Sequence, residues 1–595
     1  MTYDAQKVKS GREPVYIFEI DLDSCSLAYG VGLCTASGSA SASCFNTLGT
    51  CQDSLNYAKT TKTYRFASTR LDDLTGPVFP TVKSVKTSPT ILTPAKGFGI
   101  RSQVTVTLQD HPWNDVDVDP YFRDRTYNPE DQGTFWGKLI ARNIYTEGRT
   151  LRIKTGYLAD DGTYDASNFI TRTYFIDRIT GPNASGQVNI TGRDALRFAD
   201  SEKAQVPTQS RATLTNDIDG SVTSFDITDP DGQIKASYDA GQVYIRIDDE
   251  TMLLNSVTGT APSYTLSVAR SAMPSIYNGV MSSESHTADS TVQDCYQYTS
   301  EPINDIVEHL LGDVAGISAS YLDTTGWQAV IASGLQNYQF SALITEPTGV
   351  KDLMEELTEH GILVWWDERK QKVKMDSMIA RVPDFGPFDD SANIVADSVQ
   401  YSRDDKSRIS QVWLSHGLRN PVLPMDELNN FESSRLIIDQ DGESTDQYGQ
   451  KRIRRIWSRW LPLSSISVVD EIIQRTLAYY KVTKKHITIA LDPKDDDAWT
   501  GDIINTTTRQ VQDEFGAPRS LDYRVLSVDE MLKPGGVQLK YTLQSIDQDG
   551  VRYGLIGPNT LNDYDVESDA NKTTYAFIVA DTEVFGDGGA PYRIV

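Results

Sequence analysis

The sequence lacks the long apolar run that a membrane-spanning helix requires. Apolar residues make up 39% of its 595 residues, and no stretch approaches the length of about 18 that a spanning helix needs. Positive charge is also in short supply, because 56 Lys and Arg against 82 Asp and Glu leave a formal net charge of −26. Since phosphate binding needs concentrated positive charge, we expect no surface that grips nucleic acid. The composition therefore favours a soluble, globular protein that does not adhere to DNA.

Catalytic motifs are scarce as well. None of the six histidines has HExxH or another metal-ligand spacing. No GxSxG, P-loop or GxGxxG run stands between a strand and a helix, so we expect no enzyme. His309 and His360 fall on or near the ends of expected helices, which favours hydrogen-bonded structural roles. Three acidic runs, 226–233, 491–499 and 586–592, lack the length and terminal Glu of an EF-hand and are interpreted as turns.

Cysteine is rare, yet it is concentrated in one place. Of five cysteines, four lie within 27 residues: Cys25, Cys34, Cys44 and Cys51. The segment between them consists largely of Gly, Ser, Ala and Thr, and it has too little Leu, Ile and Val to fix its loops by apolar burial. A metal, a cluster or disulfides must therefore hold this segment. The fifth thiol, Cys295, is interpreted as a small buried hydrophobe.

The spacing C-x8-C-x9-C-x6-C distinguishes only in part between a metal ion, a cluster and disulfides. Zinc ribbons and fingers usually present cysteine pairs two to four residues apart, and this segment has no such pair. Four thiolates on longer loops suit an iron–sulfur cluster, whose irons lie apart and each need one ligand. Disulfides are the alternative, and they require an oxidising compartment. The first 14 residues contain no apolar core of a secretory signal, so we expect folding in a reducing cytosol.

Strands dominate the expected secondary structure. In residues 103–108 three apolar side chains alternate with polar ones, as in a half-buried strand, and residues 537–543 repeat the pattern. Residues 242–254 and 362–378 are predicted to form hairpins. The first turns at Asp248–Asp249, and in the second Trp365 and Trp366 face opposite sides.

Three segments have the periodicity of amphipathic helices. Their apolar stripes run over residues 303–311, 350–357 and 469–480. Gly312 is expected to stop the first helix, and Gly361 to provide a left-handed cap after the second. Ser467 is expected to be the N-cap of the third. The sequence therefore predicts a mainly β, multidomain protein with small α+β elements.

The chain length suggests about four domains, and breaks in the patterns suggest their boundaries. Residues 17–22 and 62–70 are predicted to be strands that pair across the cysteine loop. The expected parts are an N-terminal β-element with the cysteine loop (1–79), a β-barrel domain (80–200), an inserted β-rich surface module (201–295), an α+β domain (296–400), a second β-barrel domain (401–550) and an extended C-terminal arm (551–595).

Two regions resemble a known family. The run YGVGLCTASGSASASCFNTLGTCQDSLNYAKTTKTYRF resembles the cysteine-rich segment of tail-hub and tail-tip proteins of long-tailed bacteriophages and related gene transfer agents. The pieces Cys-Phe-Asn-Thr at 44–47 and Cys-Gln-Asp at 51–53 carry this resemblance, with Tyr57 just after. Downstream, GTFWGKLIARN, GRTLRIKTGY, TRTYFIDRITGP and VNITGRDAL are similar to the hub domain of the same proteins. The two regions cover about a third of the chain.

The resemblance implies a trimeric baseplate hub at the distal end of a tail tube. Two tube-like β-barrel domains per subunit would form a pseudo-sixfold ring of three subunits, which could seat on a hexameric tail ring. The implied partners are the distal tail ring protein, the tape measure protein and central fibre or receptor-binding tail proteins, with genomic DNA passing through without specific binding. The implied location is the tail tip of a virion, assembled in the host cytoplasm.

The resemblance also implies a cofactor. Lambda-type members hold a 4Fe–4S cluster through four cysteines, which correspond to Cys25, Cys34, Cys44 and Cys51; zinc is the alternative metal. In those members the cluster segment is expected near the C-terminus, whereas here it lies near the N-terminus. Two other classes compete with a hub. An iron–sulfur redox enzyme would need a second cofactor site, which the sequence does not offer, and a secreted β-rich adhesin held by disulfides would need a secretory signal.

Overall fold

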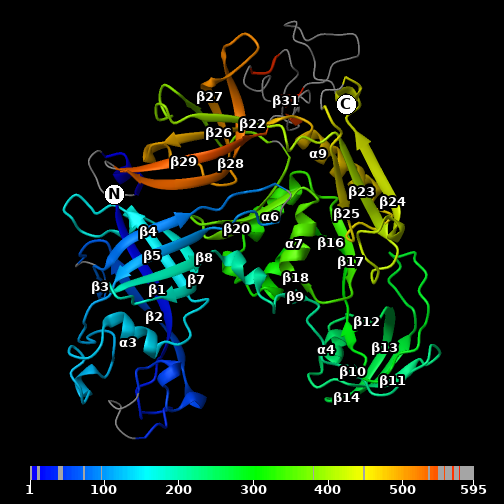
Figure 1. Cartoon of the computed structure of the whole chain (residues 1–595), viewed down its shortest axis with the longest axis horizontal. Helices are drawn as coiled ribbons and strands as arrows, with labels where there is room; N and C mark the ends of the chain where they lie inside the picture. The colour runs from blue at the N-terminus through cyan, green and yellow to red at the C-terminus, as the bar shows by residue number, and fades with distance from the viewer. Residues whose placement is uncertain are drawn as a thin grey trace. The chain divides into compact units, whose positions relative to one another are not determined.

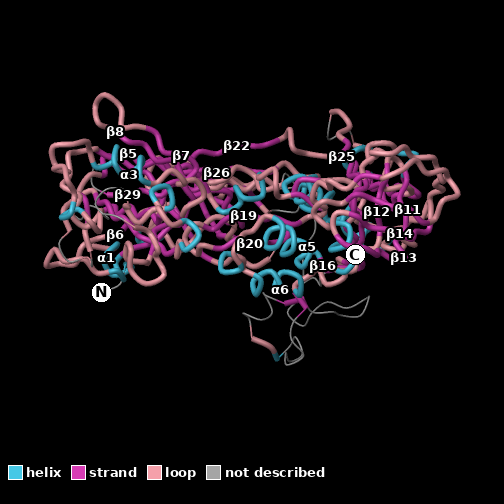
Figure 2. The backbone as a smooth tube through the Cα atoms, turned by 90° about the horizontal axis from the view of Figure 1, so that it is seen from below, coloured by secondary structure: helices cyan, strands magenta, loops and turns pink. Residues whose placement is uncertain are grey.

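The computed structural model confirms a mainly β, multidomain chain (Figures 1 and 2). It divides into two compact units, residues 1–546 and residues 547–595. The described residues are 3–9, 14–37, 44–71, 74, 76–94, 97–379, 381–445, 449–533 and 536–546, with 555–556, 566–568 and 575–576 in the second unit. In that unit β30 (Leu555–Ile556) and β31 (Tyr575–Ala576) form a parallel pair. The rest of the expected C-terminal arm lies outside the described residues, as does the acidic run 586–592.

A nearly closed, barrel-like sheet of eight strands contains the N-terminal part of the chain (Figure 1). Its order is β3-β2-β1-β6-β7-β8-β5-β4, so strands from residues 1–79 and from residues 80–200 share one sheet. The bounds are β1 Val15–Cys25, β2 Lys59–Ala67, β3 Val78–Phe79, β4 Val82–Ser88, β5 Gln103–Gln109, β6 Thr150–Gly156, β7 Phe169–Thr180 and β8 Gln187–Arg193. The predicted strand at 103–108 is confirmed as β5, whose Val104, Val106 and Leu108 are buried.

Helix α3 (Phe135–Arg142) covers one face of this sheet. The indole of Trp136 stacks on Phe66 of β2 with ring centroids 5.0 Å apart. The run GTFWGKLIARN, which is not among the three segments with predicted helical periodicity, forms this helix. Thr134 caps the helix by accepting a hydrogen bond from the Gly137 amide, and the apolar side chains follow a helical rather than an alternating spacing.

A second sheet lies within residues 201–295 and has its own apolar core. It contains β10 (Thr213–Leu214), β11 (Ser224–Thr228), β12 (Tyr244–Ile247), β13 (Glu250–Thr260), β14 (Ser263–Ala269) and β15 (Val292–Asp294), with α4 (Gln233–Asp239). The predicted hairpin at 242–254 is confirmed as β12–β13, because Ile247 pairs with Glu250 across the turn at Asp248–Asp249.

The region from residue 296 to 379 supplies much of the largest apolar core. Its elements are β16 (Tyr296–Pro302), α5 (Ile303–Glu308), η6 (His309–Val314), η7 (Ala319–Tyr321), α6 (Thr324–Ala332), β17 (Gln339–Ile344), β18 (Thr348–Gly349), α7 (Val350–Thr358), β19 (Ile362–Asp367) and β20 (Lys372–Ser377). Strand β18 pairs with β9 (Gln205–Val206). The predicted hairpin at 362–378 is confirmed as β19–β20, and Trp365 and Trp366 contribute to different apolar clusters.

The three predicted helices exist, with two corrections at their ends. Gly361 adopts a left-handed conformation after α7, at φ +95°, as expected. Gly312 does not stop the first helix, because α5 continues as a π-helix to Val314. Ser467 is not an N-cap, since α9 (Ile466–Tyr480) begins one residue before it.

Two further sheets complete the first unit. A six-stranded sheet contains β21 (Phe385–Asp389), β22 (Gln400–Asp404), β26 (Lys484–Leu491), β27 (Ile503–Gln512), β28 (Pro518–Lys533) and β29 (Gly536–Ser545), in the order β21-β27-β28-β29-β26-β22. A three-stranded sheet contains β23 (Gln411–Leu418), β24 (Phe431–Ile438) and β25 (Ile453–Trp457), and α9 packs against it. The six-stranded sheet has an apolar core separate from that of the eight-stranded sheet.

Candidate metal-binding site

The cysteine segment is the connection between two neighbouring strands of the eight-stranded sheet. Strands β1 and β2 pair in antiparallel register from Ile17–Ala67 to Cys25–Lys59, which confirms the predicted pairing across the loop. Cys25 is the last residue of β1, and the Ser26 amide donates to the Ala58 carbonyl at 2.9 Å. The sheet therefore fixes both ends of the loop.

Inside the loop, the carboxylate of Asp53 joins two cysteine-bearing stretches. It accepts hydrogen bonds from the Thr35 amide at 2.6 Å and the Thr35 hydroxyl at 2.9 Å. These bonds and one from the Asn56 side chain hold the pKa of Asp53 below its usual value. Thr35 directly follows Cys34, and Asp53 stands two residues after Cys51. The Asp53 carboxylate therefore joins the stretch that carries Cys34 to the stretch that carries Cys51. Short 3-10 turns, η1 (Leu48–Thr50) and η2 (Ser54–Asn56), shape the chain on either side of Cys51.

A pair of arginines outside the loop clamps its centre. The Phe45 ring lies between the guanidinium groups of Arg125 and Arg142, at 3.8 Å and 4.2 Å from the ring centroid. Arg125 also donates to the Cys44 carbonyl at 2.7 Å, and it forms a buried ion pair with Asp119 at 2.6 Å. Arg142 forms its own ion pair with Asp115 at 2.7 Å. Sequence reasoning missed these anchors, because the residues lie far from the cysteines along the chain and have no motif.

The loop brings the four thiols into one neighbourhood. All five cysteines of the chain are free, so no two are joined as a disulfide. Burial raises the pKa of the Cys44 thiol, and a backbone hydrogen bond from Asn46 opposes this. The thiols of Cys51, Cys34 and Cys25 raise the pKa further. The Cys25 amide donates to the Asn46 carbonyl at 2.7 Å, which joins the first cysteine to the stretch that carries Cys44.

The spacing and surroundings of the sulfurs bear on which group they could hold. No three of the four Sγ atoms lie within 4.8 Å of one another. A tetrahedral zinc site with Zn–S bonds of about 2.3 Å would bring all its sulfurs to about 3.8 Å from one another. The Asn46 amide donates to Cys44 Sγ and the Asp53 amide to Cys51 Sγ, both at 3.4 Å. Such N–H donors favour the thiolate form that binds metal, so the residues fit a cluster with separated corners.

The other polar residues considered in the sequence have structural partners. His309 Nδ1 lies 2.9 Å from the Tyr298 hydroxyl, and His360 Nε2 lies 2.7 Å from the Ser458 hydroxyl. Burial lowers the pKa of His360 to about 4, so its ring is neutral near pH 7. These contacts confirm the hydrogen-bonded roles. Cys295 is buried in an apolar cluster, as expected, and its burial raises the pKa of the thiol.

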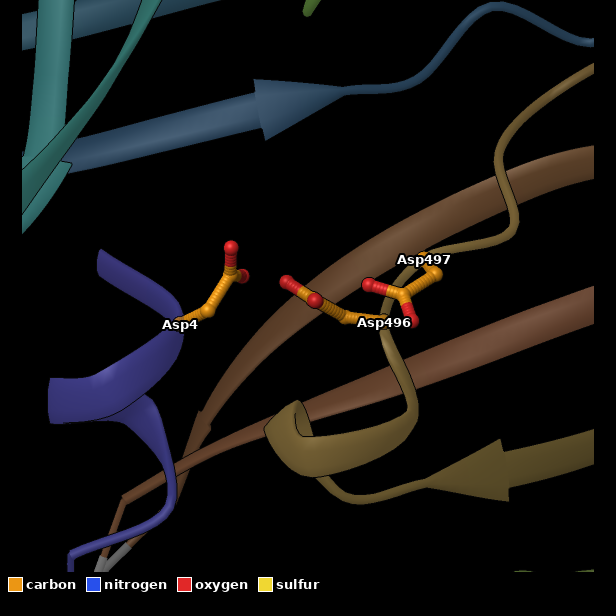
Figure 3. Close-up of side chains that lie close together, drawn as sticks. All are labelled: Asp4, Asp496 and Asp497. Atoms are coloured by element: carbon orange, nitrogen blue, oxygen red, sulfur yellow. The ribbon is translucent and has the colours of Figure 1, made fainter. Parts of the chain in front are cut away.

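Three carboxylates converge near the N-terminus, from α1 (Tyr3–Lys7) and from the acidic run 491–499 (Figure 3). Asp4, Asp496 and Asp497 all pair with the ammonium group of Lys7, at 3.0 Å, 2.6 Å and 3.2 Å respectively. Arg369 pairs with Asp496 as well, at 2.9 Å. Lys7 and Arg369 thus already pair with these carboxylates, and acidic groups of this kind do not by themselves indicate a metal ion. Within the described part of the chain, no helix combines the length and apolar character needed to cross a membrane.

Comparisons with known proteins were made for both sequence and structure. No family model and no curated protein matches the sequence. The similar solved structures include a tail protein from Neisseria meningitidis MC58, at 10% identity and a TM-score of 0.30, covering 78% of this chain and 96% of the other. A gene transfer agent virion chain gives 11% identity and a TM-score of 0.29, with coverages of 59% and 92%. A Francisella PdpA–VgrG complex chain gives 8% and 0.33, with coverages of 93% and 57%. Similarity at this level does not establish a function.

Proposed function

We propose that this chain is a structural virion protein, the hub of the baseplate at the distal end of a long phage tail. The resemblance of residues 29–66 and 133–196 to hub and tail-tip proteins is its main support. The presence of two large sheets with separate cores in one chain is compatible with two tube-forming domains per subunit. Three such subunits would place six β-domains around one axis and so match a sixfold tail ring to a threefold hub.

We further propose that Cys25, Cys34, Cys44 and Cys51 hold a 4Fe–4S cluster. The observation that carries this proposal is the gathering of four free thiols in one loop whose two ends are fixed by the pairing of β1 with β2. When bound, the cluster would supply four strong bonds to a segment that has almost no apolar core. Its role would be to fix the loop in one shape, with no turnover of substrate.

The loop offers a surface for contact with a neighbouring tail protein. Four apolar side chains around the cysteines are exposed: Val31 by 63%, Leu33 by 72%, Leu48 by 44% and Leu55 by 98%. Exposed apolar groups gathered in one segment are typical of an interaction site. We propose that this surface meets one of the implied partners, which are the distal tail ring, the tape measure protein and the fibre or receptor-binding proteins.

The acidic character of the chain suits a conduit for DNA. A net charge of −26 per chain repels a polyanion, so the genome could pass through the opened hub without adhering to it. This placement implies assembly in the host cytoplasm and a final location at the virion tail tip.

Anaerobic purification of the full chain tests the cluster. We expect absorbance near 400 nm and about four iron and four sulfide ions per chain. Zinc alone would replace the cluster with a structural ion and leave the hub assignment standing. Absence of both metals, together with oxidised cysteines, would contradict the cluster and favour a disulfide-held adhesin. An iron–sulfur redox enzyme would require a second cofactor to co-purify.

Replacement of any one of the four cysteines by Ser tests the role of the loop. We expect each variant to lose its iron and to exchange the amide hydrogens of residues 44–51 faster, because the segment has no apolar core to replace the lost bonds. Tail completion should fail. Cys295→Ala is the matched control, since it removes a thiol outside the loop and should retain iron. Infectious tails of normal yield from a loop variant would contradict the structural role.

A further inference from the structure

A cavity of about 420 Å³ lies against the inner face of the barrel-like, eight-stranded sheet. Tyr16 of β1 stands opposite Thr155 of β6, and both line the cavity. Ile153 of β6 stands opposite Arg172 of β7, and these two line it as well. Opposite residues of an antiparallel pair share one face of a sheet, and Ile153 belongs to the apolar core of this sheet. Barrel-like sheets commonly hold their ligands at such a position, in cavities of about 300–1,000 Å³.

Two further strands form the sides of this cavity. The edge strand β4 contributes residues 85–88, and β28 of the six-stranded sheet contributes Glu530. Arg172 and Glu530 form an ion pair across the two sheets, and the Arg369 guanidinium lies 3.7 Å from the same carboxylate. The charge of Glu530 is thus already engaged by protein groups. Lys86 has no ion pair among the described residues, so its ammonium group adds an unpaired positive charge to the lining.

The floor of the cavity also contains polar atoms without a partner. Arg172 and Thr155 are only 5% and 7% exposed, yet Nε of Arg172 and the hydroxyl oxygen of Thr155 have no hydrogen-bond partner among the described residues. The Nε–H group can only donate, and the hydroxyl group can donate as well. Buried polar groups in folded proteins are nearly always paired. Together with the charge of Lys86, these two donors favour an oxygen acceptor that carries negative charge.

We propose that this cavity binds a small oxyanion, which is a carboxylate or a phosphate group. Its oxygens accept hydrogen bonds from Nε of Arg172 and from the Thr155 hydroxyl, and the Lys86 ammonium pairs with its charge. Because the lining comes from both large sheets, the bound anion also holds β4 and β7 against β28. The site lies within one chain, so it depends neither on the proposed trimer nor on the proposed cluster.

Isothermal titration calorimetry of the full chain with sodium phosphate and, separately, with sodium succinate tests the proposal. Sodium chloride keeps the ionic strength constant, which removes the general effect of screening on a chain with a net charge of −26. We expect one anion per chain with a Kd on the order of 1 mM. Binding of phosphate alone would assign the site to phosphate groups, and binding of succinate alone would assign it to carboxylates. Binding of neither anion would leave the buried donors to water and overturn the proposal.

Two variants test the place of binding. Lys86→Gln removes the unpaired charge, and Thr155→Val removes the hydroxyl and keeps the branched shape of the side chain. Each should weaken binding about tenfold, as expected for the loss of one ion pair or one hydrogen bond to a charged group. Lys83→Gln is the matched control, because it removes the same charge from an exposed position of β4 outside the cavity lining.

The control should bind the anion as tightly as wild type does. Equal weakening in Lys83→Gln and Lys86→Gln would show an effect of net charge alone and would overturn the site. Lys86 is exposed on an edge strand, so its variant should fold even if Thr155→Val does not. Wild-type affinity in Lys86→Gln would place the anion elsewhere on the molecule and would also overturn the proposal.

Discussion

Asp194 shows how burial alone can make one residue sensitive to pH. It follows β8 and precedes the 3-10 helix η5 (Ala195–Asp200), and it is fully buried. One of its carboxylate oxygens accepts a hydrogen bond from the Ser102 amide at 2.9 Å. Burial raises the pKa of this carboxyl to about 7; Arg101 opposes the rise and Glu368 adds to it.

The raised pKa gives a prediction with a definite sign. The folded state holds a proton on Asp194 that the unfolded state releases near its usual pKa of 3.8, so this stability is complete below about pH 4 and is lost as the pH rises through 7. Between pH 5 and pH 8 the loss is about 3 kcal/mol, at about 1.4 kcal/mol per pKa unit. The variant Asp194→Asn should not show this loss, so its thermal stability relative to wild type should rise as the pH rises from 5 to 8. The same change in melting temperature between pH 5 and pH 8 in both proteins would contradict the prediction.

Among the secondary-structure elements, those with a regular apolar periodicity could be predicted from the sequence, whereas the residues at which helices begin and end were predicted less well. The strand β5 and the hairpins β12–β13 and β19–β20 follow from alternation that involves adjacent residues only. Helix α3 was missed, because its eight residues are bordered by β-like runs and its cap is a single Thr. Gly312 and Ser467 were assigned to helix ends by residue type. The first helix instead continues beyond Gly312 to Val314, and α9 begins at Ile466, before Ser467.

Besides the proposed cluster, the contacts of Arg125 and Arg142 with the Phe45 ring should stabilise the cysteine loop. Phe45→Leu keeps all four thiols and removes the ring between the two guanidinium groups. Each buried cation–π contact contributes about 1–2 kcal/mol. We expect faster amide exchange in residues 44–51 and faster iron loss to a chelator.

The control for this change is Phe515→Leu, which replaces a ring that is 89% exposed. It should leave both the exchange and the iron retention unchanged. Wild-type exchange in Phe45→Leu would show that the strands β1 and β2 hold the loop without the clamp.

At the scale of the whole molecule, the eight-stranded and six-stranded sheets have separate apolar cores, and in the proposed hub each would contribute a wall to the ring. A closed threefold ring requires each copy to present two different contact surfaces, because its interfaces are heterologous. The exposed apolar groups of the cysteine loop are one candidate for such contacts with neighbours.

The proposed hub predicts the mass in solution. Light scattering behind size-exclusion chromatography should give three times the chain mass of 66.1 kDa. The association should tighten with salt, because screening weakens the repulsion between chains that each carry a net charge of −26. A monomer at all protein and salt concentrations would contradict a hub that trimerises by itself.

Features that depend on near neighbours along the chain follow from the amino-acid sequence alone. They are the alternation of the strands, the apolar stripes of the helices, the net charge and the four cysteines in a segment with too few apolar residues to fix its own conformation. The residues that contact this segment follow only from the way the chain folds. Arg125 reaches the Cys44 carbonyl across 81 positions, and Lys7 meets Asp496 across 489. Contacts over such separations leave no periodic trace in the sequence, because they arise only when segments far apart along the chain pack against one another.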